Sequence, residues 1–178
     1  DKNAPWTDVR RAVVTASEAI SSSMNEAVDR VVSNWLSTIR PGDVVITHSL
    51  SSTIIRVLVS QEVRPLAIFV SESRTACEGL SVAKKVVEAG HSDVTVIPDC
   101  ALPALIQKLI NEGRNPRVIV GADAIFGAGS FFNKTGTRSI ALACKEFGIR
   151  LNVLADSQKI GSQKTSPNQF AELCHDSF

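Results

Sequence analysis

The chain has 178 residues, of which 44% are hydrophobic and 21% charged, a globular composition that allows one domain, or one domain with an extension. Its 19 Lys and Arg against 18 Asp and Glu give a net charge of +1, which argues against broad non-specific nucleic-acid binding, because such binding needs a surplus of cations. The sequence shows neither a signal peptide nor an apolar run near the ~20 residues that cross a membrane.

The first forty residues predict one long helix. Apolar residues recur in steps of three and four over 8–39, which is the stripe of an amphipathic helix. Thr7 or Asp8 can cap its start, and Pro41 ends it. Such a helix would be about 48 Å long, so we expect part of the stripe to contact another domain or subunit. The serine run at 21–23 leaves a division into two helices open.

After Pro41, short β-branched runs alternate with stretches of helical spacing. The runs are almost continuously apolar, as in parallel strands that are covered on both faces, and they lie at 44–47, 66–70, 94–97, 117–120 and 151–154. The helical stretches lie at about 52–62, 80–89, 101–112 and 136–147. Right-handed crossovers between such repeats predict an α/β fold, a Rossmann-like doubly wound parallel sheet preceded by the long helix. The strand order does not follow from the sequence.

The carboxyl ends of these strands are where the site is expected, because ligands bind there in open parallel sheets. An ionisable residue lies at or just beyond each strand end, in the segments 47–49, 71–74, 98–100, 121–123 and 155–159. Neither Gly-x-Gly-x-x-Gly after the first strand nor Gly-x-x-x-x-Gly-Lys-Ser/Thr is present, which argues against the common nucleotide-binding loops.

One of the later loops has the composition of an anion site. Asn133-Lys134-Thr135-Gly136-Thr137 leads directly into a predicted helix. The unpaired N–H groups of a helix start, with Lys134 beside them, can bind a phosphate or a carboxylate. Alternatively, Asn133 or Thr135 only caps the helix and Lys134 is solvated. The local sequence leaves both interpretations open.

Four stretches, taken in order, resemble one protein family. They are Thr47-His48-Ser49-x-Ser51-Ser52-Thr53, Glu72-Ser73-Arg74 followed by Glu78-Gly79, Val120-Gly121-Ala122-Asp123, and Asn133-Lys134-x-Gly136-Thr137. The family unites the alpha, beta and delta subunits of translation initiation factor 2B with isomerases of methylthioribose 1-phosphate and ribose 1,5-bisphosphate. The resemblance covers about residues 41–160, and the last two stretches at this spacing are its most specific signal.

The resemblance implies a role for each matching residue. In the enzymes a cysteine that acts as acid or base occupies the position of Ser49, and the aspartate matching Asp123 is its partner in moving hydrogen between C1 and C2. Substrate-binding positions of the family match Arg74, Gly79, Asn133, Lys134 and Lys159. Neither a cofactor nor a metal is expected.

Ser49 is the departure that matters for this chemistry. A thiol has a pKa near 8.5, whereas an alcohol is much less acidic and needs a neighbouring base. His48 is adjacent, but successive side chains of a strand point to opposite faces. We therefore favour a packed or hydrogen-bonded structural role for His48, and a pocket whose acid has changed.

Other polar residues at the strand ends have two interpretations each. Asp99 either lies at the pocket rim or serves a turn or cap. Asp156 either orients Lys159 or forms an ordinary ion pair. Glu72 either contacts Arg74 or faces a partner subunit.

The four cysteines show no metal-binding pattern. No Cys-x-x-Cys is present, which excludes a zinc ribbon. Cys144 lies in an apolar stretch and is expected to be a buried hydrophobe, while the neighbours Cys174 and His175 are poorly arranged to chelate one ion. A reduced, cytoplasmic protein is the default expectation.

The leading hypothesis is an initiation factor 2B-related protein with an isomerase-type pocket for a phosphorylated sugar, in which Ser49 makes catalysis doubtful. The alternative is a non-catalytic regulatory subunit that acts in translation initiation through protein contacts, and a third possibility is a domain for another small anion. Residues 1–40 are expected to form the end of a helical region, and residues 41–178 the Rossmann-like sugar-phosphate-binding domain. Because the chain begins with Asp1, we expect a longer protein, which forms homo- or hetero-oligomers and contacts neither nucleic acid nor membrane directly.

Overall fold

The fold of the chain is seen in a computed structural model, which describes residues 5–60, 67–127 and 129–161. Five parallel strands form one sheet in the order β3-β2-β1-β4-β7. Their bounds are β1 Val44–Thr47, β2 Ala67–Ser71, β3 Val94–Ile97, β4 Pro116–Val120 and β7 Leu151–Val153. The chain moves outward from β1 through β2 to β3 and then returns to the other side of β1 with β4. The strand order therefore reverses between β1 and β4, and this reversal is where a parallel sheet opens a crevice for ligands.

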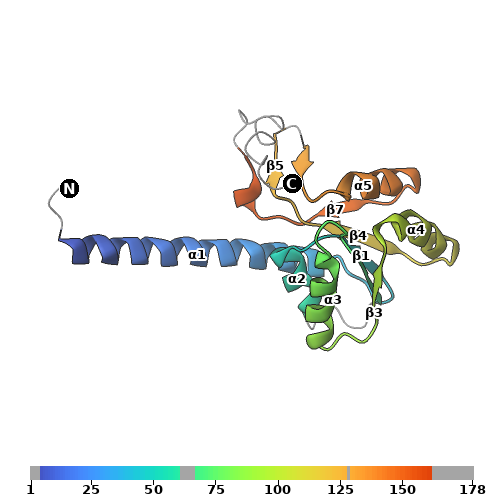
Figure 1. The fold of residues 1–178 in the computed structure, drawn as a ribbon, viewed down its shortest axis with the longest axis horizontal. Helices are drawn as coiled ribbons and strands as arrows, with labels where there is room; N and C mark the ends of the chain where they lie inside the picture. The colour runs from blue at the N-terminus through green and yellow to red at the C-terminus, as the bar shows by residue number, and fades with distance from the viewer. Residues whose placement is uncertain (1–4, 61–66, 128, 162–178) are drawn as a thin grey trace.

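Helices cover both faces of the sheet (Figure 1). They are α1 Trp6–Leu36, α2 Ser52–Val59, α3 Glu78–Glu88, α4 Leu102–Asn111 and α5 Thr137–Glu146, with short 3₁₀ helices η2 Asp99–Ala101 and η3 Ser157–Lys159. The end of α1, α2 and α3 share one hydrophobic core with the sheet. Helices α4 and α5 share a second core on the other face. This arrangement confirms the predicted doubly wound α/β fold.

The alternation of side chains along the strands explains the two cores. Val45 of β1 packs into the core of α2 and α3, whereas its neighbours Val44 and Ile46 pack into the core of α4 and α5. All three side chains are fully buried. A strand buried on both faces must be apolar at consecutive positions, which is why the period of two is not visible in this part of the sequence.

Helix α1 is a single element, unbroken across the serine run at 21–23. The predicted cap at Thr7 or Asp8 is wrong: the N-cap is Pro5, and it makes no side-chain cap hydrogen bond. Proline presets a backbone φ that suits a helix start, so the helix begins earlier than a polar cap would indicate. It also ends at Leu36, before Pro41.

Only the C-terminal part of α1 is anchored. Trp35 is buried and lies under the guanidinium of Arg117, 4.7 Å from the ring centroid, and Arg56 of α2 pairs with Asp29. The N-terminal part projects beyond the sheet (Figure 1). Trp6 is 87% exposed and Ile20 is 60% exposed, so the apolar stripe of this part has no cover within the described residues.

A small hairpin follows β4 and was not predicted from the sequence. Its strands β5 Ala124–Ile125 and β6 Phe131–Phe132 are antiparallel and pair Ala124 with Phe132. The backbone N–H of Asp123 also donates to the carbonyl of Phe132 at 2.8 Å. The hairpin therefore returns the chain so that Asn133 and Lys134 follow at its base, beside Asp123.

Candidate anion-binding site

The candidate site lies at the carboxyl edge of the sheet, next to the reversal of strand order. Ser49 comes just after β1, and Asp123 comes just after β4. The loops after these strands touch each other, since a Cβ built on Gly121 would lie 2.8 Å from Oγ of Ser51. The predicted catalytic residues therefore follow the two strands that flank the reversal, as the expected crevice requires.

Glu78, the first residue of α3, is the centre of this edge. Its Oε2 accepts hydrogen bonds from the hydroxyl of Ser49 at 3.1 Å and from the backbone N–H of Leu50 at 3.2 Å. Its Oε1 accepts from Nζ of Lys134 at 3.0 Å. We call these three donors, the Ser49 hydroxyl, the Leu50 amide and the Lys134 ammonium, the anion cradle. Donors from two loops that are distant in the sequence thus converge on one carboxylate.

The cradle holds Glu78 in its charged form. Partial burial alone would raise the pKa of this carboxyl group, but the hydrogen bonds from Lys134, Leu50 and Ser49 and the positive charge of Lys134 together keep the pKa below its ordinary value. A carboxylate that accepts several hydrogen bonds is stabilised as an anion. The side chains of Glu78 and Lys134 remain 21% and 35% exposed, so the cradle is open to solvent.

Two features of the backbone place Glu78 there. Gly79 lies directly beneath β2, where an added Cβ would be 1.9 Å from the carbonyl oxygen of Ser71. Cys77, the N-cap of α3, has a left-handed conformation with φ 52°. A residue with a side chain could not take the place of Gly79 without moving the helix or the strand, so glycine fixes the close approach of α3.

The start of α5 contradicts the interpretation in which a side chain caps the helix and Lys134 is solvated. The N-cap is Gly136, with φ 106° and no side-chain cap hydrogen bond, so neither Asn133 nor Thr135 is the cap. Asn133 instead donates from Nδ2 to Oγ1 of Thr137 at 2.9 Å. Lys134 is paired with Glu78 rather than solvated.

Asp99 holds the loop after β2. Its carboxylate oxygens accept the backbone N–H groups of Ser73 and Arg74, each at 2.8 Å. Burial would raise the pKa of Asp99, but these two bonds, a bond from Ser71 and the nearby His48 keep the pKa below its ordinary value. The turn role considered for Asp99 is therefore observed, in the loop of the neighbouring strand, and Asp99 also lines a cavity of about 170 Å³ beside His48.

His48 has the hydrogen-bonded structural role that the strand geometry predicted. Its side chain is buried; Nδ1 lies 2.5 Å from Oγ of Ser71, and Nε2 lies 2.9 Å from the carbonyl oxygen of Thr135. A carbonyl only accepts, so the contact with Thr135 requires a proton on Nε2. Gly136 packs on the same ring, since an added Cβ would lie 2.8 Å from Nε2. His48 thus fixes the loop that carries Lys134.

Within the described residues, the remaining predicted residues form no hydrogen bond or ion pair with the cradle. Asp123 and Lys159 are exposed. Arg74 is exposed and lies 3.4 Å from Oε2 of Glu72, which is one of the two contacts considered for Glu72. Asp156 was expected to orient Lys159 or to form an ion pair, but its Oδ1 accepts the N–H of Gln158 and caps η3. The substrate-binding roles of these residues stay predictions.

Glu78 is the functional candidate that sequence reasoning missed. It was noticed only as the neighbour of Gly79 in a motif, and no local pattern links it to Ser49 or Lys134. Two features of the sequence could have identified Glu78. A serine that takes part in proton transfer needs a neighbouring base, and a glutamate lies at the start of the helix that follows β2. The spatial link itself depends on three loops that meet only in the fold.

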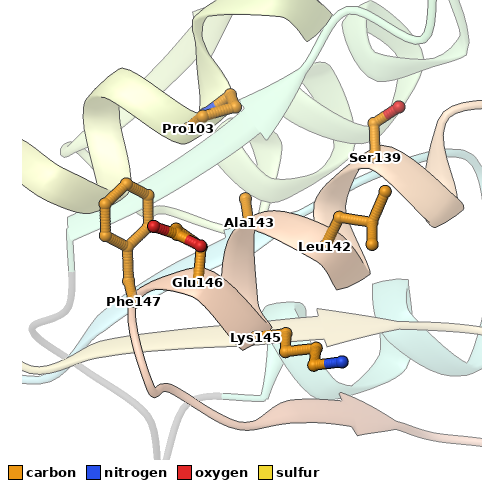
Figure 2. A pocket seen from close by; sticks show the side chains of 7 residues that line it. All are labelled: Pro103, Ser139, Leu142, Ala143, Lys145, Glu146 and Phe147. Atoms are coloured by element: carbon orange, nitrogen blue, oxygen red, sulfur yellow. The ribbon is translucent and has the colours of Figure 1, made fainter.

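Two hollows in the described part of the chain border α5 and have volumes typical of small-molecule sites. One of about 640 Å³ is lined by the hairpin and the start of α5, including Asn133 and Lys134. The other, of about 690 Å³, lies between α4 and α5; Figure 2 shows Pro103 of α4 facing side chains along α5, among them Leu142 and Phe147. The second hollow contains no residue of the cradle, so the first is the candidate ligand pocket.

Other kinds of site find no support in the described part of the chain. Within residues 5–60, 67–127 and 129–161, no group of three or more His, Cys, Asp or Glu is arranged to hold a metal ion. Among the helices of these same residues, none is long and apolar enough to cross a membrane. Cys174 and His175 lie outside the described residues.

The fold and the edge together define a Rossmann-like α/β protein in which three hydrogen-bond donors surround the carboxylate of Glu78 at the reversal of strand order. Comparison with known proteins identifies which one: the model of the Initiation factor 2 subunit family matches residues 1–176, and the chain belongs to this family. The resemblance inferred from the four motifs is thereby confirmed.

Both branches of the expected family appear among the relatives. A ribose 1,5-bisphosphate isomerase of Methanocaldococcus jannaschii is 32% identical over 92% of this chain and 51% of its own length. A protein of Pyrococcus furiosus named as eIF-2B subunit 2-like is 30% identical over 91% of this chain and 57% of its own length. The crystal structure of the Pyrococcus horikoshii OT3 translation initiation factor eIF-2B has a TM-score of 0.77 and 29% identity, covering 86% of this chain and 54% of that one. The chain thus spans about half the length of the relatives it matches.

Proposed function

We propose that this chain binds a phosphorylated sugar at the carboxyl edge of its sheet, in an isomerase-type pocket. The observation that carries the proposal is the anion cradle, in which Lys134, the Leu50 amide and the Ser49 hydroxyl converge on one negatively charged group. Backbone N–H groups and lysine are the donors with which proteins hold phosphate groups. The isomerase name of one relative supports a sugar phosphate as the ligand class.

Turnover is the weaker part of the proposed activity. If Ser49 stands where the enzymes have an acidic cysteine, the step that needs a proton donor loses it, because an alcohol holds its proton far more tightly than a thiol. The Ser49 hydroxyl also donates its hydrogen bond to Glu78. We therefore propose that the chain binds the sugar phosphate and converts it slowly or not at all, with Asp123 as the remaining member of the catalytic pair.

The test uses ribose 1,5-bisphosphate and methylthioribose 1-phosphate as ligands in thermal unfolding and in calorimetric titration. A ligand at 100 times its Kd stabilises the folded state by about 2.7 kcal/mol, which is a shift of several degrees for a chain of this size. We expect Lys134→Met to weaken binding at least tenfold. Lys145→Met, on the exposed face of α5, is the matched control and should bind like the unaltered chain. If neither ligand shifts the melting temperature, the pocket is not a sugar-phosphate site.

A second function, a non-catalytic subunit that acts in translation initiation through protein contacts, is favoured by one observation. The apolar stripe of α1 is exposed at Trp6, Val13 and Ile20, and exposed apolar faces of this kind mark protein contacts. In this proposal residues 1–40 belong to a helical region and the protein works in the cytoplasm as an oligomer of family subunits. A pull-down from cell extract that recovers no translation factor and no sister subunit would count against it.

A further inference from the structure

We propose that Glu78 is a built-in occupant of the anion cradle, and that a phosphoryl group enters the cradle only by displacing this side chain. The inference rests on the proposed function and concerns the regulation of the same site. All three donors of the cradle already bond to the two oxygens of Glu78. A phosphate that used Lys134 and the Leu50 amide would have to take the place of the carboxylate, because both present the same kind of acceptor oxygen.

Glu78 is held in a way that permits exchange. It is the first residue of α3, so its side chain can swing outward while the carboxylate stays near the helix N-terminus, where negative charge is favourable. The pair with Lys134 is partly exposed, and ion pairs that water reaches contribute little to stability. Asp99 is different, because it holds two backbone N–H groups of a neighbouring loop and is part of the framework.

The exchange would select ligands by charge. A neutral sugar cannot replace the carboxylate, since Lys134 and the Leu50 amide would lose an anion and gain only neutral acceptors. A phosphate monoester brings at least one negative charge and has more acceptor oxygens than a carboxylate. The cradle is therefore expected to bind phosphate esters and to reject unphosphorylated sugars.

The competing explanation is that Glu78 positions Lys134 and Ser49 for the ligand and stays in place when the ligand binds. The two explanations predict opposite effects of removing the charge. A displaced occupant lowers the affinity of the unaltered chain, so its removal tightens binding. A positioning residue supports the affinity, so its removal weakens binding.

The experiment compares three variants of the 178-residue chain in calorimetric titrations with inorganic phosphate and with ribose 1,5-bisphosphate. Glu78→Gln removes the charge at nearly constant shape, and Glu78→Asp keeps the charge but shortens the reach toward the cradle. Glu88→Gln is the matched control: it lies on the same helix, pairs with Lys84 at 3.9 Å and is exposed. Thermal unfolding of each variant confirms that it is folded.

We expect Glu78→Gln to bind both probes about tenfold more tightly than the unaltered chain, which corresponds to about 1.4 kcal/mol. Glu78→Asp should change in the same direction and Glu88→Gln should bind like the unaltered chain. Equal or weaker binding by the folded Glu78 variants, while the unaltered chain binds, would overturn the inference and leave the proposed function standing. If neither the unaltered chain nor any variant binds either probe, the inference and the proposed function are both wrong, because the cradle would then reject the anion even after Glu78 is removed.

Discussion

Gly79→Ala tests whether the close approach of α3 to β2 builds the site. The added methyl carbon would lie 1.9 Å from the carbonyl oxygen of Ser71 and 2.8 Å from its carbonyl carbon. Both atoms belong to the backbone of a fully buried residue, so no rotamer change can relieve the contact. Helix and strand must separate by about 1.5 Å before the contact becomes ordinary.

The magnitude follows from two opposing effects. Overpacking a tight interior costs about 1–3 kcal/mol, and the rigid backbone partner places this site at the upper end. Replacing glycine by alanine in a helix stabilises the helix by at most about 1 kcal/mol through its higher helix propensity. We expect a net loss of about 2 kcal/mol in the free energy of unfolding, or about 4–8 °C in melting temperature for a chain of this size.

Urea unfolding followed by circular dichroism measures this loss. Ser81→Ala adds a helix former at an exposed position of the same helix, and this control should stay within about 0.5 kcal/mol of the unaltered chain. If Gly79→Ala is equally neutral, the helix does not approach the strand as closely as described. The explanation of how Glu78 is placed would then be wrong.

Three further outcomes are expected. Ser49→Cys should convert ribose 1,5-bisphosphate at least about 10²-fold faster than the unaltered chain, since it restores an acidic group at the edge; unchanged turnover in a variant that still binds would refute the assignment of this position. Folding lowers the pKa values of Glu78 and Asp99 below their ordinary values of 4.5 and 3.8. Above these ordinary pKa values the two carboxylates stabilise the folded state, and this stabilisation is lost as the pH falls through the lower pKa values of the folded state. The urea concentration at the midpoint of unfolding should therefore fall as the pH is lowered from 6, and it should fall less steeply for Glu78→Gln than for the unaltered chain. Burial raises the pKa of Cys144 to about 11, so a thiol reagent at pH 8 should label exposed Cys100 and spare Cys144 in the folded chain, as site-resolved mass spectrometry would show.

The sheet could be predicted from the sequence because its strands are covered on both faces. Val44-Val45-Ile46-Thr47 is apolar without interruption up to its last residue, and β1 has these bounds. Gly90, Gly113 and Gly148 come just after the ends of α3, α4 and α5, and all three have positive φ values, of 93°, 70° and 64°. Such elements depend on burial and local backbone preference, which a single sequence expresses directly.

The hairpin after β4 could not be predicted in the same way. Its strands have two residues each, which is too short for an alternating pattern to be recognised. Yet the hairpin decides where the chain returns, and so brings Lys134 to the cradle. Sequence motifs identified Lys134 as a candidate, but its contact with Glu78 depends on this return and on the position of α3.

His48 and Ser49 show that adjacent residues can have separate roles. The alternation of a strand predicted that the ring would not serve the hydroxyl, and the ring does bond to Ser71 and Thr135 instead. The carboxylate that the hydroxyl contacts is that of Glu78, from a different element. The sequence could thus exclude the adjacent partner, whereas the actual partner required the fold.

Backbone strain supports the view that the edge is built for a ligand. Among the described residues, the non-glycine residues with positive φ are Ser49, Ser73 and Cys77, and all of them lie in the loops around the cradle. Each such conformation costs about 1–3 kcal/mol and persists only where its surroundings enforce it. The enforcement is visible: the N–H of Ser49 donates to Oγ of Ser73, and the N–H of Ser73 donates to Asp99. A sheet that needed only to pack could end its strands without this cost, so the strain is best explained by the need to direct the Ser49 hydroxyl and the Leu50 amide at one anion.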